Sequence, residues 1–123
     1  MINLHYKYIF LIFLIFSQLN ATDIRSLLFH GNCATCHFKT RSHSAPSVME
    51  LRQRYLDAFS NKEDFINYMA TWVHKPKAET SLMHDAIDKY ELMPELGFDL
   101  PTLREISAYI YEVDFSKRHE GHK

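Results

Sequence analysis

Cys33-Ala34-Thr35-Cys36-His37 is the stretch on which the interpretation of this 123-residue chain depends. Its two thiols are the only ones in the protein, and a histidine directly follows the second. Two intervening residues set the thiols apart to match the two vinyl groups of a haem, and the adjacent imidazole then falls below the iron. The spacing therefore predicts covalent attachment of one haem c at Cys33 and Cys36, with His37 as an axial iron ligand.

Three other kinds of site use the same pair of cysteines. A thioredoxin-like redox pair is expected near a βαβ pattern, which this sequence lacks. A structural zinc site needs a second pair of ligands, and the sequence has no further cysteine and no closely spaced histidine pair near the motif. A structural disulfide between Cys33 and Cys36 remains compatible with an exported protein.

Residues 1–21 have the pattern of a secretory signal peptide. Lys7 precedes an apolar run from Tyr8 to Phe16, and Ala21 supplies a small residue before the expected cleavage point. The apolar run is short for a membrane span, which takes about 20 apolar residues. Because Leu19 is not the small residue that a cleavage site prefers, an uncleaved N-terminal anchor stays open as the alternative. Haem attachment takes place outside the bacterial cytoplasm, so the expected location is the periplasm.

Residues 22–115 are expected to form a single small domain, followed by a polar C-terminal tail at 116–123. The chain has 14 basic and 15 acidic side chains and a formal net charge of −1. Cleavage of the signal segment removes only Lys7 among these charged residues. This near-neutral charge argues against nucleic acid as a partner and provides no strong electrostatic steering.

The domain is predicted to be all-α. The chain has only three glycines and no alternating apolar pattern long enough for a sheet, whereas apolar residues recur at helical spacing. Capping boxes are expected at Ser60–Glu63 and at Thr102–Glu105. The expected helices cover residues 23–32, 47–59, 60–74, 80–90 and a last segment that begins at 102.

The first of these helices is expected to bury Ile24, Leu27 and Leu28 on one face, and the helix at 80–90 to bury Met83. The first and last helices are expected to cross. The residues expected at this crossing are Leu27, Leu28 and Phe29 on one side and Ile106, Tyr109 and Ile110 on the other.

The order of these features is a helix, C-x-x-C-H, a proline-containing loop, three short helices, a Met-Pro loop and a last helix. This order resembles that of the class I monohaem cytochromes c over nearly all of residues 22–115. The resemblance implies the cytochrome c fold, with about five short helices around one covalently bound haem. It also implies that the carbonyl of Pro46 accepts a hydrogen bond from His37, although the glycine usual before this proline is Ala45 here.

The second axial ligand is expected to be Met93. This methionine lies in a loop, precedes Pro94 and comes shortly before the last helix, where the resemblance places the axial methionine. Met83 is the leading substitute, whereas Met49 and Met69 are expected in helices. A second histidine is the other possibility, and the histidines concerned are His30, His43, His74, His84, His119 and His122.

Trp72 is a candidate hydrogen-bond donor to a haem propionate, with a place in the core of its helix as the alternative. Arg41, Arg52 and Arg54 are candidates to neutralise propionates, although most such charges form a solvated surface.

The expected function is one-electron transfer rather than catalysis, because His37 and Met93 together leave no open iron position. Other redox proteins are then the expected partners, through small and transient docking. A membrane is expected as a partner only if residues 1–21 are retained. Two alternatives stay open: an enzyme or sensor with a free sixth position for peroxide or a diatomic gas, and a subunit of a larger oxidoreductase complex.

Overall fold

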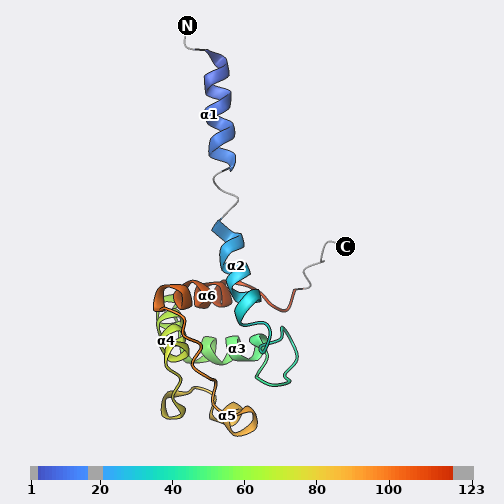
Figure 1. Ribbon diagram of the computed structural model, residues 1–123, viewed down its shortest axis with the longest axis vertical. Coiled ribbons are helices and arrows are strands. Elements are labelled where there is room, and N and C mark those ends of the chain that lie inside the picture. The colour runs from blue at the N-terminus through green and yellow to red at the C-terminus, as the bar shows by residue number, and fades with distance from the viewer. Residues whose placement is uncertain (1–2, 17–20, 118–123) are drawn as a thin grey trace.

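A computed structural model of the chain describes residues 3–16 and 21–117. Within these ranges the protein is all-α, as predicted, and has no β-strand (Figure 1). A short 3-10 turn, η1, spans Ala78–Thr80. The α-helices are α1 (Leu4–Phe16), α2 (Ala21–Asn32), α3 (Val48–Ala58), α4 (Lys62–His74), α5 (His84–Tyr90) and α6 (Leu100–Glu112). Of the predicted tail at 116–123, residues 118–123 lie outside the described ranges.

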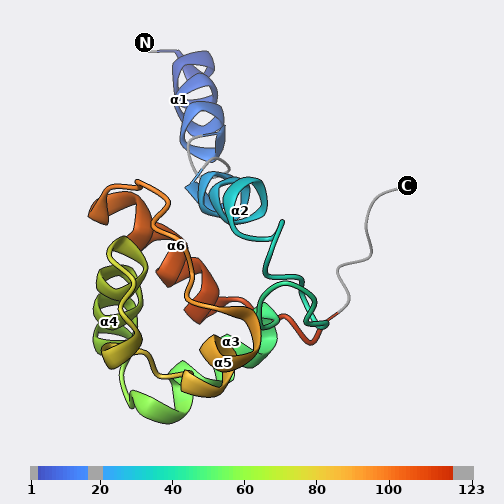
Figure 2. The same cartoon turned by 60° about the horizontal axis from the view of Figure 1, so that its bottom comes forward.

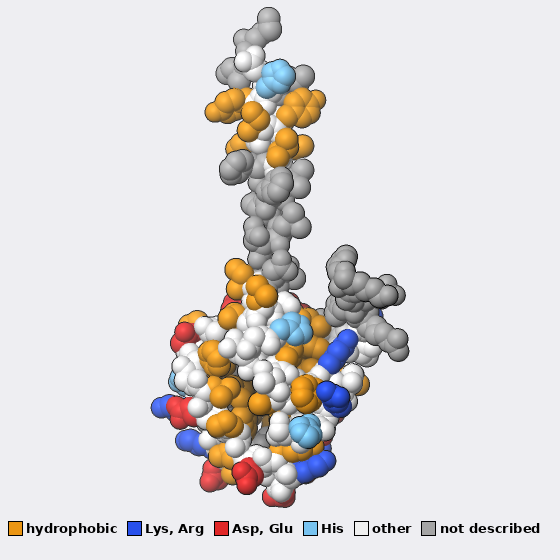
Figure 3. Space-filling model, turned by 45° about the vertical axis from the view of Figure 1, so that its right-hand side comes forward, with side chains coloured by type: hydrophobic (Ala, Val, Ile, Leu, Met, Phe, Trp, Pro, Cys, Tyr) orange, Lys and Arg blue, Asp and Glu red, His pale blue; other side chains and the backbone are white. Residues whose placement is uncertain are grey.

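The helix α1 coincides with the apolar run of the predicted signal peptide and lies apart from the other helices (Figure 1). Apolar side chains project from it, and those from Tyr8 to Ile12 are more than half exposed (Figure 3). No helix among the described residues is both long and apolar enough to cross a membrane. Leu19, on which the cleavage question depends, lies outside the described residues, so cleavage stays a prediction.

The core lies between α2, α3, α4 and α6. α4 and α6 pack closely along each other, α2 crosses α6, and α3 contacts both α4 and α6. Phe65 on α4 and Val48 on α3 are completely buried, which removes a large apolar area from water. Met69 on α4 and Ile106 on α6 join the same cluster, at the helical spacing that the sequence indicated.

The crossing of α2 and α6 depends on aromatic side chains. The ring of Phe29, which is 2% exposed, lies 5.4 Å from the ring of Tyr109, centroid to centroid. The hydroxyl of Ser26 donates to the Tyr109 hydroxyl at 3.3 Å. Phe29 faces α6, and Ser26, which lies one helical turn earlier, therefore faces α6 as well. Ile24 and Leu27 therefore point outward, 59% and 69% exposed, and their predicted burial is wrong.

The start of α4 is one residue later than the predicted capping box implied. Asn61, not Ser60, is the N-cap, and its side-chain oxygen accepts the N–H of Asp64 at 2.9 Å. Its amide nitrogen also donates to the carboxylate of Asp64 at 2.6 Å. The Asn61–Asp64 pair therefore takes the place of the expected Ser60–Glu63 pair.

The start of α6 is earlier than predicted. Asp99 is the N-cap, and its carboxylate accepts the N–H of Thr102 at 2.8 Å. Pro101 follows in the first turn, where a residue without an N–H costs nothing because that N–H has no helical partner. The box expected at Thr102–Glu105 is wrong, and Asp99-Leu100-Pro101 was the overlooked signal.

The predicted helix at 80–90 is divided. η1 ends at Thr80, Ser81 is extended, and α5 begins only at His84. The hydroxyl of Ser81 accepts the N–H of Met83 at 3.0 Å, a local bond that competes with helix formation. Met83 is therefore the N-cap residue of α5 rather than part of a helix, although it is buried as predicted.

Replacing Phe29 with Ala is expected to lower the free energy of unfolding by about 3–5 kcal/mol, because it leaves a cavity between α2 and α6. Leu27→Ala, two residues away on the exposed face, is expected to change it by less than about 0.5 kcal/mol. Urea denaturation of both variants checks this. Equal losses would contradict the observed face of α2.

Asn61→Ala is expected to destabilise the protein by about 1 kcal/mol, because the Asp64 N–H loses its acceptor. Ser60→Ala is expected to stay within about 0.5 kcal/mol of the parent. Thermal denaturation distinguishes the two N-cap positions, and a larger loss for Ser60→Ala would restore the capping box at Ser60–Glu63.

Candidate haem-attachment site

The C-x-x-C-H motif continues the last turn of α2. The N–H of Cys33 donates to the carbonyl of Phe29 at 2.8 Å, and the N–H of His37 donates to the carbonyl of Cys33 at 2.9 Å. The N–H of Cys36 also turns back to Cys33, at 3.3 Å. This turn brings both cysteines and His37 to the lining of the same cavity.

The imidazole of His37 is held by the loop that follows the motif. Its Nδ1 lies 2.8 Å from the carbonyl oxygen of Pro46, so the predicted partner is present. Burial lowers the pKa of His37, although the contact with the Pro46 carbonyl opposes this shift. The imidazole is therefore neutral near pH 7, with its proton on Nδ1, and the Nε2 lone pair is left for a metal.

The carbonyl of Pro46 is itself fixed in place. The next residue, Ser47, is the N-cap of α3, and its side chain accepts the N–H of Glu50 at 3.2 Å. The backbone N–H of Ser47 donates to the hydroxyl of Ser42 at 3.0 Å. Val48 donates its N–H to the carbonyl of Phe38, next to His37, at 2.9 Å. The presence of Ala45 in place of glycine therefore does not prevent this loop from closing.

The two cysteines are free thiols in different surroundings. Cys33 is partly buried and packs against the core, whereas Cys36 is exposed. Burial, together with the nearby Cys36, raises the pKa of Cys33 to about 11. Redox-active C-x-x-C pairs need a lowered thiol pKa, so this environment does not suit a thioredoxin-like role.

A zinc site is not supported either. Among the described residues, no group of three or more His, Cys, Asp or Glu side chains is arranged to hold a metal ion. Among the described residues, His37 is the only histidine in the cavity wall. Its Nδ1 is engaged with Pro46, so its Nε2 lone pair is free.

The cavity beside the motif has a volume of about 280 Å³, close to the lower limit of the roughly 300–1,000 Å³ usual for cofactor pockets. Residues of α2, α3, α4, α5 and α6 line it. Figure 2 shows how these helices are arranged relative to one another. Apolar side chains gather on the face of the molecule shown in Figure 3. The main apolar side chains in the cavity wall are Leu51, Tyr55, Met69, Ile87, Leu103 and Ile106.

Two buried hydroxyl groups in the wall are already paired within the protein. The hydroxyl of Ser107 donates to the carbonyl of Leu103 at 2.7 Å, and the hydroxyl of Ser81 accepts from Met83. Within the described ranges, no buried side-chain nitrogen or oxygen lacks a hydrogen-bond partner. The cavity wall thus combines mainly apolar side chains with one imidazole nitrogen and two thiols, the groups that could hold a covalent haem.

Three methionines line the cavity: Met69, Met83 and Met93. Met69 lies within α4 as predicted and belongs to the core cluster. Met83 is 7% exposed and sits at the start of α5. Met93 is half-buried in the loop between α5 and α6. The structure therefore brings both candidate sixth ligands, Met93 and Met83, to the same cavity as His37.

Among the described residues, His37 is the only histidine in the cavity wall, so His30, His43, His74 and His84 do not line it. His30, His43 and His84 are exposed. The Nδ1 of His74 lies 2.9 Å from the carbonyl oxygen of Phe98. The tail histidines His119 and His122 lie outside the described residues.

The predicted propionate donors have other partners. Trp72 lines the cavity, but its only N–H donates to the carbonyl of Lys77 at 3.0 Å. Arg52 donates to the carbonyls of Ile110 and Tyr111, both at 2.8 Å, and so caps the end of α6. A propionate contact by Trp72 stays a prediction, and it requires the indole to give up its bond to Lys77.

No family model, no curated protein and no solved structure matches this chain. The interpretation of the site therefore depends on its own residues and their geometry.

In the haem-free protein, Cys33 is expected to react with iodoacetamide roughly a hundredfold more slowly at pH 8 than in urea, because a pKa near 11 leaves far less thiolate. Peptide mapping by mass spectrometry measures this rate separately from that of Cys36. The rate at Cys33 should rise about tenfold per pH unit up to pH 10. A rate that is already maximal at pH 8 would show a lowered pKa and revive the redox-pair interpretation.

Proposed function

We propose that this protein is a one-electron carrier of the bacterial periplasm, with a single haem c attached at Cys33 and Cys36. Its axial ligands are His37 and Met93, and the fold is that of the class I cytochromes c. The observation that carries this proposal is the neutral, oriented imidazole of His37, held by Pro46, in the wall of the apolar cavity that both cysteines line. A thioredoxin-like pair or a zinc site would not require that combination.

Each part of the site has a distinct task. The thiols of Cys33 and Cys36 anchor the group, and Nε2 of His37 binds the metal while Pro46 fixes the ring orientation. The apolar wall excludes water, which affects the reduction potential. A haem held in this way supplies reversible one-electron exchange at its iron. With protein ligands on both sides of the metal, the chain offers no position for a substrate, so we infer a carrier rather than an enzyme.

Met93 is preferred to Met83 as the sixth ligand because of its surroundings. Met83 is nearly fully buried at the N-cap of α5, where its own backbone is engaged with Ser81. Met93 lies in an extended loop between Glu91 and Asp99, without helical constraints, and its neighbour Pro94 cannot donate a backbone hydrogen bond. A loop residue can adjust its sulfur position to a metal more easily than a helix-cap residue.

The partners of such a carrier are other redox proteins. Leu92 and Leu96 line the cavity and are also 42% and 43% exposed, so they provide an apolar rim beside Met93. Together with the near-neutral net charge, this rim suits a small, short-lived contact surface rather than a strongly charged one. Periplasmic location follows from the attachment chemistry and from the N-terminal segment.

A role as a subunit of a larger oxidoreductase complex is the second candidate. The observation that favours it is the outward exposure of Ile24 and Leu27, which lie one turn apart on α2. Size-exclusion chromatography of the protein from its native host separates the two roles, since a free carrier elutes as a small monomer.

Met93→Ala is expected to abolish the weak absorption band at about 695 nm that the oxidised protein shows with His/Met ligation. Met83→Ala is the matched control, because Met83 lines the same cavity, and is expected to keep the band. Optical spectra of periplasmically expressed protein, oxidised and reduced, measure this. Loss of the band only in Met83→Ala would assign the ligand to Met83.

A wild-type spectrum without this band has two meanings. If the reduced protein binds carbon monoxide, the sixth position is open, and the carrier gives way to an enzyme or sensor. If it does not, a second histidine holds the iron and the assignment of Met93 is wrong.

A further inference from the structure

The segment from Lys77 to Phe98 forms one side of the cavity and carries both Met83 and Met93. Its only α-helix, α5, is a short one of seven residues. The closely packed helix pairs are α4 with α6, α2 with α6, and α3 with α4 and α6, and α5 takes part in none of them. Contacts between backbones therefore do little to hold this segment on the rest of the domain.

Side chains of α4 hold the segment at its two ends. At the first end, Trp72 donates to the carbonyl of Lys77 at 3.0 Å, and the Tyr68 hydroxyl donates to the carbonyl of Thr80 at 2.7 Å. At the other end, Nδ1 of His74 lies 2.9 Å from the carbonyl oxygen of Phe98. All three contacts reach backbone carbonyls on residues that flank the methionine-bearing part.

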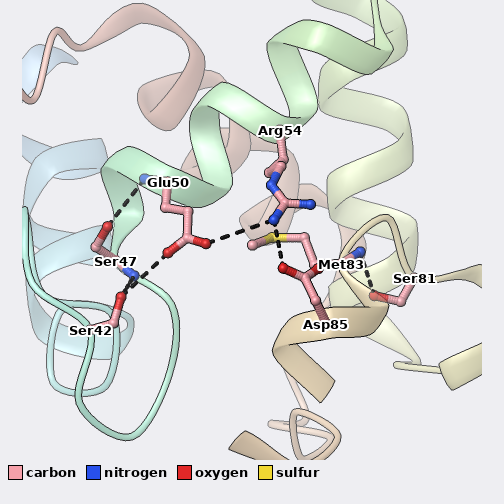
Figure 4. A network of polar contacts seen from close by, with 7 residues as sticks. All are labelled: Ser42, Ser47, Glu50, Arg54, Ser81, Met83 and Asp85. Atoms are coloured by element: carbon pink, nitrogen blue, oxygen red, sulfur yellow. Dashed lines mark hydrogen bonds and ion pairs between the residues drawn. The ribbon is translucent and has the colours of Figure 1, made fainter. Parts of the chain in front are cut away.

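The middle of the segment has one polar connection to the helical frame. Nη2 of Arg54, on α3, contacts Oδ2 of Asp85, in the first turn of α5, at 2.6 Å (Figure 4). Among the described residues, no other hydrogen bond or ion pair links residues 81–97 to α2, α3, α4 or α6. Asp85 comes two residues after Met83, so this contact acts close to the cavity wall.

Arg54 also connects to the loop on the histidine side of the cavity. Its guanidinium lies 4.0 Å from the carboxylate of Glu50, whose other oxygen accepts from the hydroxyl of Ser42 at 3.4 Å (Figure 4). Ser42 in turn accepts the N–H of Ser47, which follows Pro46, the partner of His37. One surface chain of contacts thus runs from the loop that orients His37 to the segment that bears the methionines.

We propose that Arg54 is a positioning residue whose ion pair with Asp85 keeps the segment 81–97 closed over the cavity. It thereby sets how often the sixth iron position opens to an external ligand. The part that concerns the iron rests on the proposed function, whereas closure of the segment is a property of the chain alone. Both side chains are more than a third exposed, so the contact is weak and salt-sensitive. A weak contact of this kind suits a segment that opens often.

The test compares Arg54→Gln, Asp85→Asn and the double variant with Arg104→Gln. Arg104 is a matched control, because it forms an ion pair with Glu63 at 2.7 Å and the side-chain exposures are almost the same, 41% and 66% against 41% and 60%. Its pair, however, joins α4 and α6, which already pack closely.

The first measurement is backbone hydrogen exchange by mass spectrometry over residues 81–97. Exchange is expected to be about two- to fivefold faster in Arg54→Gln and in Asp85→Asn, the range for loss of an exposed ion pair. The double variant is expected to match the single ones, because both remove the same contact. Arg104→Gln is expected to leave this segment unchanged. Equal exchange in Arg54→Gln and Arg104→Gln would overturn the proposal.

The second measurement is the rate at which imidazole binds to the oxidised haem protein at saturating concentration. This rate is expected to rise by the same factor in Arg54→Gln, while about 1 M NaCl is expected to accelerate the wild type and leave the variant little changed. A rate that responds to neither change would overturn the proposal. If the protein holds no haem, the proposed function fails, whereas hydrogen exchange still decides whether Arg54 closes the segment.

Discussion

The structure depends on an apolar cavity that its own side chains do not fill. Phe29, Phe65 and Val48 form a dense core on one side, between α2, α3, α4 and α6. Leu51, Leu103 and Ile106 line the cavity next to this core, and Phe29 and Ile106 belong to both. Apolar surface left without packing partners loses dispersion contacts as well as the benefit of burial. A ligand that fills this space therefore completes the core, in addition to any chemistry it brings.

The domain therefore has two parts that are held in place by different kinds of contact. The frame of α2, α4 and α6 is held by direct contact between side chains, including the aromatic cluster of Phe29, Tyr109 and Phe115. Cys33 packs against this frame, which fixes the turn that carries the C-x-x-C-H motif. The segment from Lys77 to Phe98 faces the cavity instead and depends on side-chain contacts near its ends and on Arg54.

Local signals allowed much of this to be predicted from the sequence. The helical class follows from the spacing of apolar residues within short stretches, whereas the partner of His37 at Pro46 was implied by the resemblance to the class I cytochromes c. The errors arose where two local signals compete. Ser60 and Asn61 both suit an N-cap, and the structure uses Asn61. Thr102 has a capping-box partner, yet Asp99 with Pro101 defines the start of α6.

Other features depend on contacts between distant parts of the chain. Leu27 and Phe29 are both apolar, so helical periodicity alone does not decide which of them faces inward. The aromatic contact between Phe29 and Tyr109 decides this. The ion pair of Arg54 and Asp85 joins residues 31 positions apart, and nothing in either local sequence indicates it. Met83 and Met93 flank α5 and line the same cavity, an arrangement that the sequence alone does not reveal.

The contacts that hold the methionine-bearing segment from Lys77 to Phe98 differ between its ends and its middle. At its ends, backbone carbonyls of the segment contact side chains of α4, whereas its middle is tied by one exposed ion pair. A segment held in this way can open about its ends, and the contact of Arg54 with Asp85 is then the only polar contact with the helical frame that it loses. Because an exposed ion pair contributes little to stability, opening through this contact alone costs little. Apolar burial of Met83 and any bond between the metal and Met93 must then provide most of the closure. If Met93 binds the metal as proposed, that bond would hold the segment closed more strongly than the contact between Arg54 and Asp85 does.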